Sequence, residues 1–358
     1  MTYLDANASE PLRPGPRAAL LAALEQPGNP SSVHAAGRAA RRIVEDAREV
    51  VAAHFNAAAA DVVFTSGGTE ADALAIHSLG QGRRLIVGAT EHDAVRAAAA
   101  GAATLPVDAS GVADLDALAR LLAEGPALVC LMLANNETGA IQPVAEAARL
   151  CHAAGSLTHV DAVQAGGRMA VDFAAIGADS LALSSHKMGG PTGVGALLLG
   201  AQAAALLRPL IAGGGQERGR RGGTLPAALI AGFAAACAPP ADLTALRDAA
   251  EAAATACGAV VLGAAAPRLG NTTCLALPGV AAATQVMALD LAGVQVSAGA
   301  ACSSGKVARS HVLDAMGVGM LAGEAIRVSL PWNATMADIA HFAEAYAAMA
   351  ARLGRRAA

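Results

Sequence analysis

The sequence predicts an α/β protein built on a largely parallel β-sheet, followed by a smaller α+β domain. Apolar runs of strand length alternate with alanine-rich helical segments through the first two thirds of the chain. These runs are apolar on both sides, as expected for parallel strands covered by helices on two faces. After Pro239 and Pro240 the pattern changes to a helix, short strands and a closing helix.

The individual elements follow from this alternation of strand-length and helix-length segments. In the first part we expect strands at 61–65, 85–89, 127–134, 157–160, 180–184 and 194–199. Helices are expected between them, near 69–79, 114–123 and 144–154. In the second part a helix at 243–257 precedes strands near 271–277, 294–297 and 325–330, and a last helix begins at about Met336.

Length and composition exclude several classes of protein. At roughly 150 residues per domain, 358 residues predict about two domains with a sizeable core. The 25 Lys and Arg residues nearly balance 29 Asp and Glu residues, so the net charge of −4 predicts neither nucleic-acid nor anionic-membrane binding. The 54% apolar and 15% charged content argues against disorder.

Neither a membrane helix nor a secretion signal is predicted. The longest apolar region, 194–210, is interrupted by Gly200, Gln202, Arg208 and Pro209, so no run reaches the roughly 18 residues of a transmembrane helix. The N-terminus carries acidic residues and prolines where a signal peptide needs a basic and then an apolar region. We therefore expect a cytoplasmic protein.

The six cysteines do not form a metal-binding or redox pattern. None of them makes a C-x-x-C pair, so no metal site is predicted, and disulfides are not expected in such a chain. Cys130 and Cys274 lie inside apolar runs and are expected to be buried thiols.

Two motifs at strand ends are candidates for binding a phosphate and for forming a Schiff base. Gly67, Gly68 and Thr69 join a strand to a helix, which favours a phosphate site, although Thr69 could equally be a helix N-cap. Lys187 follows a buried strand in the segment SSHKMGG. Such lysines form Schiff bases, and the alternative is an ordinary solvated loop lysine.

Three further strand ends carry polar side chains that suit a ring-shaped cofactor. Asp161 could pair with the pyridinium nitrogen of pyridoxal phosphate, or cap a helix. His92 could stack on a cofactor ring or transfer protons, or be an ordinary loop histidine. Asn136 could donate to a phenolate, or serve only a turn.

Two residues in the second part are candidates for contact with substrate. Cys302 lies among small residues and glycines, where a reactive thiol is expected, and Lys306 and Arg309 would favour its thiolate. The alternative is a plain flexible turn. Arg327 lies on an apolar strand and needs a partner, either a substrate carboxylate or an internal acidic residue.

Taken together, these motifs resemble those of the cysteine desulfurases of the NifS/IscS type, which are pyridoxal phosphate enzymes of fold type I. The resemblance extends over nearly the whole chain. It rests on the segments YLD (3–5), GNPSSVH (28–34), FTSGGTE (64–70), EH (91–92), NNETG (135–139), HVDAVQ (159–164), SSHKMGGPTGVG (184–195), GGGQER (213–218), RGGT (221–224), SHVL (310–313) and IRVSL (326–330), with the cysteine segment 297–305.

The resemblance implies a role for each matching residue. Lys187 would bind pyridoxal 5'-phosphate covalently and move the Cα proton, Asp161 would pair with the ring nitrogen, and His92 would stack on the ring. The remaining cofactor contacts would be Gln164 and Asn136 at the phenolate oxygen, Gly68, Thr69, Ser184 and His186 at the phosphate, and Thr224 reaching the phosphate from a neighbouring subunit. The substrate carboxylate would meet Arg327, with Asn29 nearby, and Cys302 would accept the sulfur.

The implied reaction converts L-cysteine to L-alanine and leaves a persulfide on Cys302 for an acceptor, such as an iron–sulfur scaffold protein. The resemblance also implies a homodimer, with a large domain at 14–245 and a small domain made of 1–13 and 246–358. Several positions depart from the family pattern, among them Ala6, Ser9, Glu10 and Pro331. None of these departures removes a catalytic group.

Three alternatives remain at this point. A selenocysteine lyase of the same fold would share the cofactor residues, and an aminotransferase would have no use for Cys302. A non-catalytic sulfur carrier would not need Lys187, Asp161 and His92.

Overall fold

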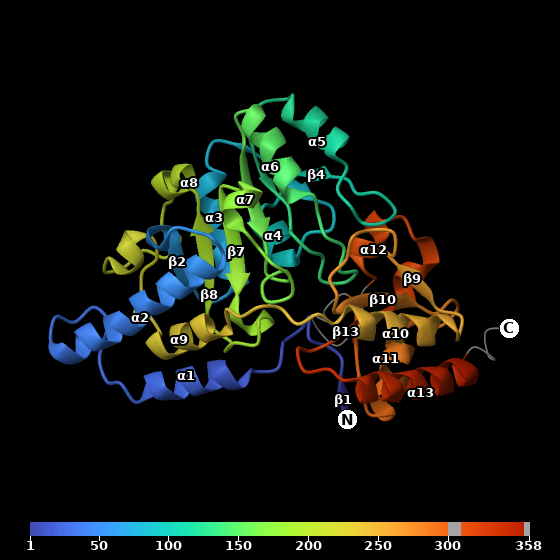
Figure 1. The fold of residues 1–358 in the computed structure, drawn as a ribbon. Helices are drawn as coiled ribbons and strands as arrows, with labels where there is room; N and C mark the ends of the chain where they lie inside the picture. Colours follow the sequence, from blue (N-terminus) through green and yellow to red (C-terminus); the bar gives the residue numbers. More distant parts are fainter. Residues whose placement is uncertain (300–308, 354–358) are drawn as a thin grey trace.

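The computed structural model describes residues 1–299 and 309–353, and a seven-stranded sheet forms its centre (Figure 1). The strand order is β2 (Val62–Thr65), β8 (Gly195–Leu199), β7 (Ser180–Ser184), β6 (Leu157–Asp161), β5 (Ala127–Cys130), β3 (Arg84–Gly88) and β4 (Ala103–Leu105). From β7 to β4 all neighbours are parallel, whereas β8 runs antiparallel to both of its neighbours. The prediction of a largely parallel sheet is confirmed.

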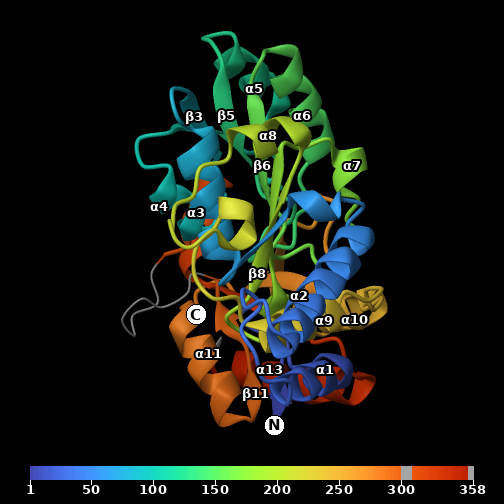
Figure 2. The same ribbon diagram turned by 90° about the vertical axis from the view of Figure 1, so that its left-hand side faces the viewer.

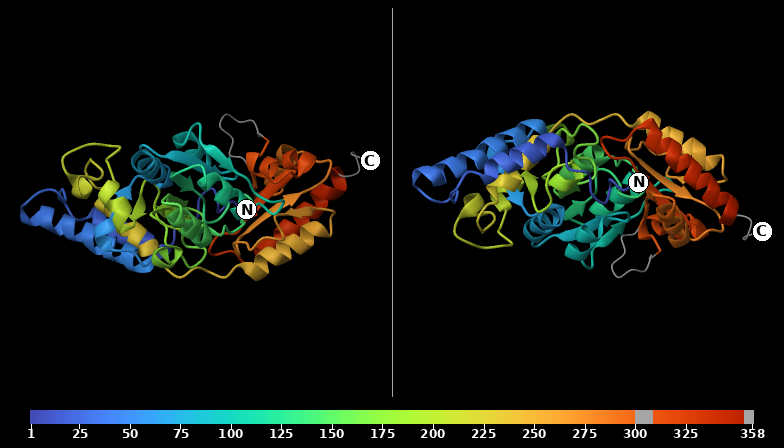
Figure 3. Two further views of the ribbon diagram at one scale, coloured as in Figure 1. Left: turned by 90° about the horizontal axis from the view of Figure 1, so that it is seen from above. Right: turned by 90° about the horizontal axis from the view of Figure 1, so that it is seen from below.

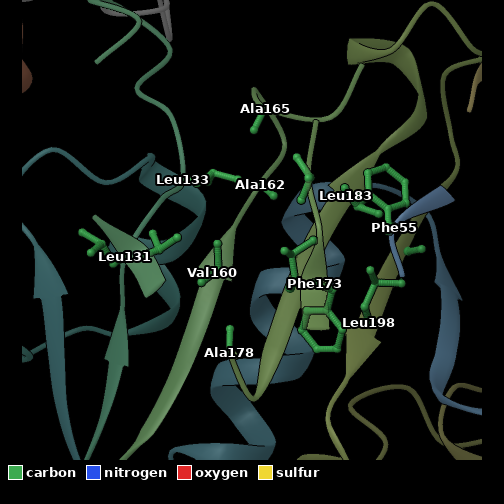
Figure 4. Close-up of a cluster of buried hydrophobic side chains, with 14 of the residues drawn as sticks. Phe55, Leu131, Leu133, Val160, Ala162, Ala165, Phe173, Ala178, Leu183 and Leu198 are labelled. Carbon is green, nitrogen blue, oxygen red and sulfur yellow. The ribbon is translucent and has the colours of Figure 1, made fainter. Parts of the chain in front are cut away.

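Both faces of this sheet are covered, which explains why its strands are apolar on both sides. Val63 and Leu197 pack against α3 (Gly68–Leu79) in one cluster. Leu198 belongs to a second cluster on the other face, together with Phe55 and Phe173 (Figure 4). Burying one such side chain contributes about 1.5–3 kcal/mol, so alternate residues of each strand stabilise opposite layers.

The helices of the large sheet begin and end near their predicted positions. Helix α5 (Leu115–Leu122) begins at Asp114, whose carboxylate accepts a hydrogen bond from the Ala117 N–H at 2.9 Å. The remaining short elements of this region are α4 (Asp93–Ala98), α6 (Val144–Ala153), α7 (Phe173–Ile176), α8 (Ala201–Leu206) and the 3-10 turns Ala59–Asp61, Ser185–Lys187 and Gln216–Gly219. The predicted strand at 127–134 is shorter than expected, because regular pairing stops at Cys130.

Two N-terminal helices were not anticipated from the sequence. Helices α1 (Pro14–Leu24) and α2 (Ala35–His54) both pack on α9 (Ala227–Ala236), as the turned view shows (Figure 2). Helix α9 is apolar around most of its circumference, so it needs cover on more than one side. Because α1 and α2 lie outside the strand–helix alternation, the pattern used for the sheet did not reveal them.

The second part of the chain forms a four-stranded antiparallel sheet in the order β12 (Ser297–Ala298), β13 (Ala325–Ser329), β10 (Thr272–Ala276) and β9 (Val260–Leu262). The sequence predicted three strands here. Strand β9 was missed, and the strand expected at 294–297 is divided into β11 (Val294–Gln295) and β12. Helices α10 (Thr244–Thr255), α11 (Ala282–Leu291) and α13 (Met336–Leu353) pack around this sheet, with α12 (His311–Ala315) and the 3-10 turn Gly319–Gly323.

The N-terminus joins this second unit rather than the large sheet. Strand β1 (Thr2–Tyr3) pairs in parallel with β11, and Leu4 is buried in the same apolar cluster as Phe342 and Tyr346 of α13. Views from above and below show the two units side by side, with the N-terminus between them (Figure 3). None of the helices in residues 1–299 and 309–353 combines the length and apolarity that crossing a bilayer requires.

Candidate active site

The predicted cofactor residues converge on one cavity at the carboxyl end of the parallel strands. Eight of the nine predicted cofactor-binding residues line it, and so does His92. The lining residues are Gly68, Thr69, Asp72, His92, Met132, Ala134, Asn136, Asp161, Val163, Gln164, Ser184, His186 and Lys187. This is the edge of an open α/β sheet at which ligands bind.

One wall of the cavity is a cradle for an anion. Helix α3 starts at Gly68, and a Cβ atom there would lie 2.5 Å from Cγ2 of Val163. Glycine therefore lets the helix N-terminus, with its free N–H groups, approach the cavity closely. Thr69 and Ser184 add hydroxyl groups to the same wall.

His186 completes this wall as a neutral side chain. Burial, together with the charges of Lys187 and Arg168, lowers the pKa of its imidazole to about 4. The hydroxyl of Ser9 lies 3.3 Å from its Nδ1 atom. His186 can therefore offer a ring N–H to a phosphate without carrying a charge of its own.

Lys187 lies in the 3-10 turn that directly follows β7. Its ammonium group contacts the backbone carbonyls of Asn7 and Ala8, the latter at 2.9 Å. Burial, with the charges of Arg168 and Arg327, lowers the pKa of Lys187 to about 7. A large fraction of this amine is thus neutral at physiological pH, which a nucleophilic or basic lysine requires.

Asp161 ends β6 at the base of the cavity. Its Oδ1 atom accepts a hydrogen bond from the Val163 N–H at 2.8 Å. Burial and the nearby Asp72 carboxylate raise the pKa of Asp161 to about 7. A cationic ring N–H beside the Asp161 carboxylate would stabilise its charged form and lower its pKa, so the site suits a pyridinium.

Asp72 is a cavity residue that the sequence analysis missed. It is buried on α3, with Nε2 of His159 at 3.1 Å, and Nδ1 of His159 lies 2.8 Å from the Ser180 hydroxyl. Burial raises the pKa of Asp72 to about 8 and lowers that of His159 to about 4. The only signal in the sequence was an acidic residue on the apolar face of a helix, three positions after Thr69.

His92 and Gln164 occupy the cavity with defined hydrogen bonds. Nδ1 of His92 accepts from the Ala94 N–H at 3.1 Å, which places a proton of the neutral ring on Nε2. The Gln164 amide donates to the Asn7 carbonyl at 3.0 Å and accepts from Arg168 at 2.8 Å.

The N-terminal segment is a second part of the site that sequence reasoning missed. The buried side chain of Asn7 donates to the Asn136 carbonyl at 3.0 Å and to the Thr272 hydroxyl at 2.9 Å. Its own backbone carbonyl accepts from Lys187 and Gln164. The only signal of this segment in the sequence is the motif at 3–5, which marks its start.

Arg327 lies behind the cavity and does not line it. Its guanidinium group pairs with Asp5 at 2.7 Å and donates to the Asn136 carbonyl at 3.1 Å. Its buried Nε atom has no hydrogen-bond partner within residues 1–299 and 309–353. The internal ion pair considered above is therefore present, and the Nε–H donor of the guanidinium is unused among the described residues.

Two predicted residues lie away from the cavity in this chain. Asn29 is exposed, and its side-chain oxygen accepts from the Ser31 N–H at 2.9 Å within a local turn. Thr224 is exposed as well, and the nearby Arg221 pairs at 2.8 Å with Glu70 in the first turn of α3. The role expected for Thr224 requires a second subunit.

Cys302 lies outside the described residues. Cys130 and Cys274 are fully buried, as predicted. Arg309, one of the two cations expected to favour the Cys302 thiolate, precedes α12 and pairs with Asp314 of that helix at 2.6 Å.

Comparison with known proteins agrees with this geometry. The family model of the class-V aminotransferases matches residues 2–342. A cysteine desulfurase of Cereibacter sphaeroides is 44% identical over 94% of this chain and 92% of its own length. An IscS-like cysteine desulfurase of Mycobacterium tuberculosis is 37% identical over 95% of this chain and 93% of its own length.

A solved structure shows the same architecture. The NifS-like protein from Rickettsia africae superposes with a TM-score of 0.88 at 31% identity, covering 98% of this chain and 99% of that one. The fold, the site and these relatives place this chain in the class-V aminotransferase family. Within that class, this chain belongs to the cysteine desulfurase family of the NifS/IscS type, so the resemblance drawn from its motifs is confirmed.

Proposed function

We propose that this enzyme is a pyridoxal phosphate-dependent cysteine desulfurase, which converts L-cysteine to L-alanine and transfers the sulfur through Cys302. The observation that carries the proposal is the meeting of Lys187, Asp161 and His92 with an anion cradle in one cavity. Family membership supplies the substrate, since relatives across the length of the chain are named cysteine desulfurases.

The cavity residues fit the cofactor group by group. The cradle of Gly68, Thr69, Ser184 and His186 offers N–H and hydroxyl donors to a phosphate. Asp161 suits the ring nitrogen, and Asn136 and Gln164 suit the phenolate oxygen. When bound, pyridoxal 5'-phosphate supplies the electron sink that makes the substrate Cα–H acidic.

Lys187 would have two functions in turn. Its neutral amine would first hold the cofactor covalently, and once the substrate amine has displaced it, the freed amine would accept the Cα proton. Both functions require a neutral amine at working pH, and the lowered pKa of about 7 supports them. His92 would stack on the ring and donate a proton, and its position in the cavity lining, with a ring N–H on Nε2, supports this role.

Cys302 would perform the sulfur step. Its thiolate attacks the substrate sulfur, so that an S–S bond forms while the substrate C–S bond breaks. The electrons of the C–S bond return to the substrate carbon, which takes up a proton and leaves as part of alanine. The enzyme keeps the sulfur as a persulfide, and no external oxidant or reductant is needed.

A direct test measures both products. The purified, cofactor-loaded protein should release alanine from L-cysteine, with one persulfide sulfur per Cys302 in the absence of an acceptor. An aminotransferase would instead need a keto acid and form no persulfide. Comparing the rates with L-cysteine and L-selenocysteine would distinguish the selenocysteine lyase. Alanine formation without persulfide would contradict the proposal.

We expect Arg327→Ala to weaken substrate binding. Loss of a charge-assisted contact to the substrate carboxylate costs roughly 1.5–3 kcal/mol, which corresponds to a KM for L-cysteine raised roughly tenfold to a hundredfold. The Nε atom left unused among the described residues supports this role. Steady-state kinetics would measure the change.

Asp5→Asn is the matched control for that variant, because it breaks the same ion pair and keeps the guanidinium. Its KM should stay near the wild-type value. If both variants raise KM equally, or if Arg327→Ala only lowers the melting temperature, the arginine serves the internal pair alone.

Capture of the cofactor should depend on pH in a way set by Lys187. Only the neutral amine attacks the cofactor aldehyde, so the capture rate should rise about tenfold per pH unit in acid and level off above its pKa. With the pKa lowered to about 7, the plateau should begin near neutrality. Stopped-flow absorbance after mixing cofactor-free protein with pyridoxal 5'-phosphate would measure this rate at each pH. A rate still rising steeply at about pH 9 would contradict the lowered pKa of Lys187.

We further propose that the enzyme is a cytoplasmic homodimer in which Thr224 reaches the neighbouring subunit's phosphate site, with Asn29 near its substrate. The exposure of both residues in a single chain supports this arrangement. The domain division at 14–245, with 1–13 and 246–358 as the small domain, is supported by the separate apolar clusters of the two units. The sulfur acceptor would be an iron–sulfur scaffold or another sulfur-carrying protein.

A further inference from the structure

Glu137 is a buried acidic residue to which the mechanism above gives no role. It is 2% exposed and follows Asn136, a residue of the cavity wall. The turn that holds it is rigid, because Oδ1 of Asn135 accepts hydrogen bonds from the backbone N–H groups of Glu137 at 2.8 Å and Thr138 at 2.9 Å. A buried carboxylate is costly unless it is hydrogen-bonded, so its partners indicate why it is there.

The hydrogen-bond partner of this carboxylate and a second close neighbour lie at the two ends of the segment that carries Cys302. On the C-terminal side, the Ser310 hydroxyl donates to Oε2 of Glu137 at 2.6 Å. The same hydroxyl accepts from the Leu313 N–H at 3.1 Å and so caps helix α12. Because a hydroxyl has one proton to donate, the carboxylate is the acceptor that uses it.

On the N-terminal side, the backbone at Gly299 packs directly against the same carboxylate oxygen. A Cβ atom at position 299 would lie 2.2 Å from Oε2 of Glu137, so a larger residue there would have to displace this carboxylate. Residue 299 directly follows β12, which pairs with β13 so that Ser297 lies opposite Arg327. The segment therefore leaves the small sheet beside Arg327 and Glu137.

A second link connects the C-terminal end of the segment to the cavity. Nε2 of His311 lies 2.9 Å from the backbone carbonyl of Glu91, and since a carbonyl only accepts, Nε2 carries the proton. Glu91 is fully buried, its carboxylate accepts from the Met132 N–H at 2.6 Å, and it directly precedes His92. The Ser310–Glu137 and His311–Glu91 hydrogen bonds thus join this end of the segment to two loops that carry cavity residues.

From this arrangement we propose that Glu137 is a positioning residue, which holds both ends of the Cys302 segment against the loop that carries Asn136. The segment would then start and return at the edge of the cofactor cavity, where the thiol must meet the substrate sulfur. This inference rests on the proposed role of Cys302 as sulfur acceptor. A displacement of about 1 Å between reacting groups can cost on the order of a hundredfold in rate, so anchoring both ends affects the sulfur step strongly.

The test compares Glu137→Ala and Ser310→Ala, which remove the acceptor and the donor of the link, with Glu146→Ala. Glu146 is a surface residue of α6 paired with Arg149, so this control makes the same chemical change at an exposed ion pair. In a single turnover with L-cysteine, persulfide formation on Cys302 should fall about tenfold to a hundredfold in both link variants. The rate of the cofactor absorbance change on adding L-cysteine should stay within about twofold of wild type, because that step does not use the segment.

A second measurement needs neither substrate nor turnover. Alkylation of Cys302 by iodoacetamide, followed by mass spectrometry, should be about threefold faster or more in both link variants, because released ends allow larger local opening. The Glu146→Ala control should match wild type in both measurements. If one link variant does not fold, the other still tests the same hydrogen bond.

The outcomes separate this inference from the proposed function. Persulfide formation and alkylation at wild-type rates in both link variants would overturn the role of Glu137. If the cofactor absorbance change in the link variants is slowed as much as the sulfur step, the positioning role of Glu137 would also be overturned. Glu137 would then act on the cavity through Asn136. Wild-type protein that gains no sulfur on Cys302 would instead refute the proposed function, while the alkylation comparison would still test the link.

Discussion

Replacing Lys187 with alanine should abolish turnover, with a loss of about a thousandfold or more in kcat, because the general base and the covalent attachment of the cofactor disappear together. Lys187 is buried beside Asn7 and Ala8 in a turn directly after β7, so a smaller side chain leaves the strand intact. The protein should fold and still bind cofactor non-covalently through the anion cradle. Its visible absorption should differ from that of wild type, as free aldehyde differs from a lysine adduct.

The composition of the chain makes this prediction unusually easy to check. Lys187 and Lys306 are its only lysines, so borohydride reduction should fix cofactor to the Lys187 peptide and not to the other. Lys306→Ala is the matched control and should keep both the covalent adduct and the absorbance change with L-cysteine. A Lys187→Ala protein that desulfurates L-cysteine near the wild-type rate would show that the cofactor assignment is wrong.

Replacing Cys302 with serine should stop sulfur transfer without disturbing the cofactor site. A hydroxyl is a poor nucleophile toward sulfur at neutral pH, whereas a thiolate is a good one, so sulfide and alanine production should fall by several orders of magnitude. Folding, colour and the initial absorbance change with L-cysteine should remain, because the cavity residues lie on other segments.

Mass spectrometry after alkylation would locate the sulfur. Wild-type protein incubated with L-cysteine should gain sulfur on the peptide containing Cys302 and on none of the other five cysteines. Burial raises the pKa of Cys130, Cys151, Cys237 and Cys274, so their thiols stay protonated and unreactive. The half-exposed Cys257 provides the matched control, since Cys257→Ser should retain activity. Alanine release by Cys302→Ser at the wild-type rate would remove Cys302 from the mechanism.

Much of the cofactor site could be predicted from the sequence, because its residues follow strand ends in a parallel sheet. Asp161, Ser184 and Lys187 each lie at or just past a strand that the apolar pattern identified, and the carboxyl ends of such strands meet at one edge. The motif FTSGGTE likewise fixes an anion cradle locally, because the strand, the glycines and the helix N-terminus are contiguous in the chain. For these parts of the site, the local sequence pattern was sufficient to predict which residues come together.

The contacts that join distant segments were decided only by the tertiary structure. Asn7 reaches Asn136 and Lys187, Asp5 pairs with Arg327, and Glu137 meets Ser310, although each pair is separated by more than a hundred residues. No periodicity or spacing encodes such pairs, because they depend on how two separate hydrophobic cores pack and where their loops meet. The local sequence pattern thus indicated most of the side chains that line the cavity, whereas the packing of the small sheet against the large one decided which distant groups became their neighbours.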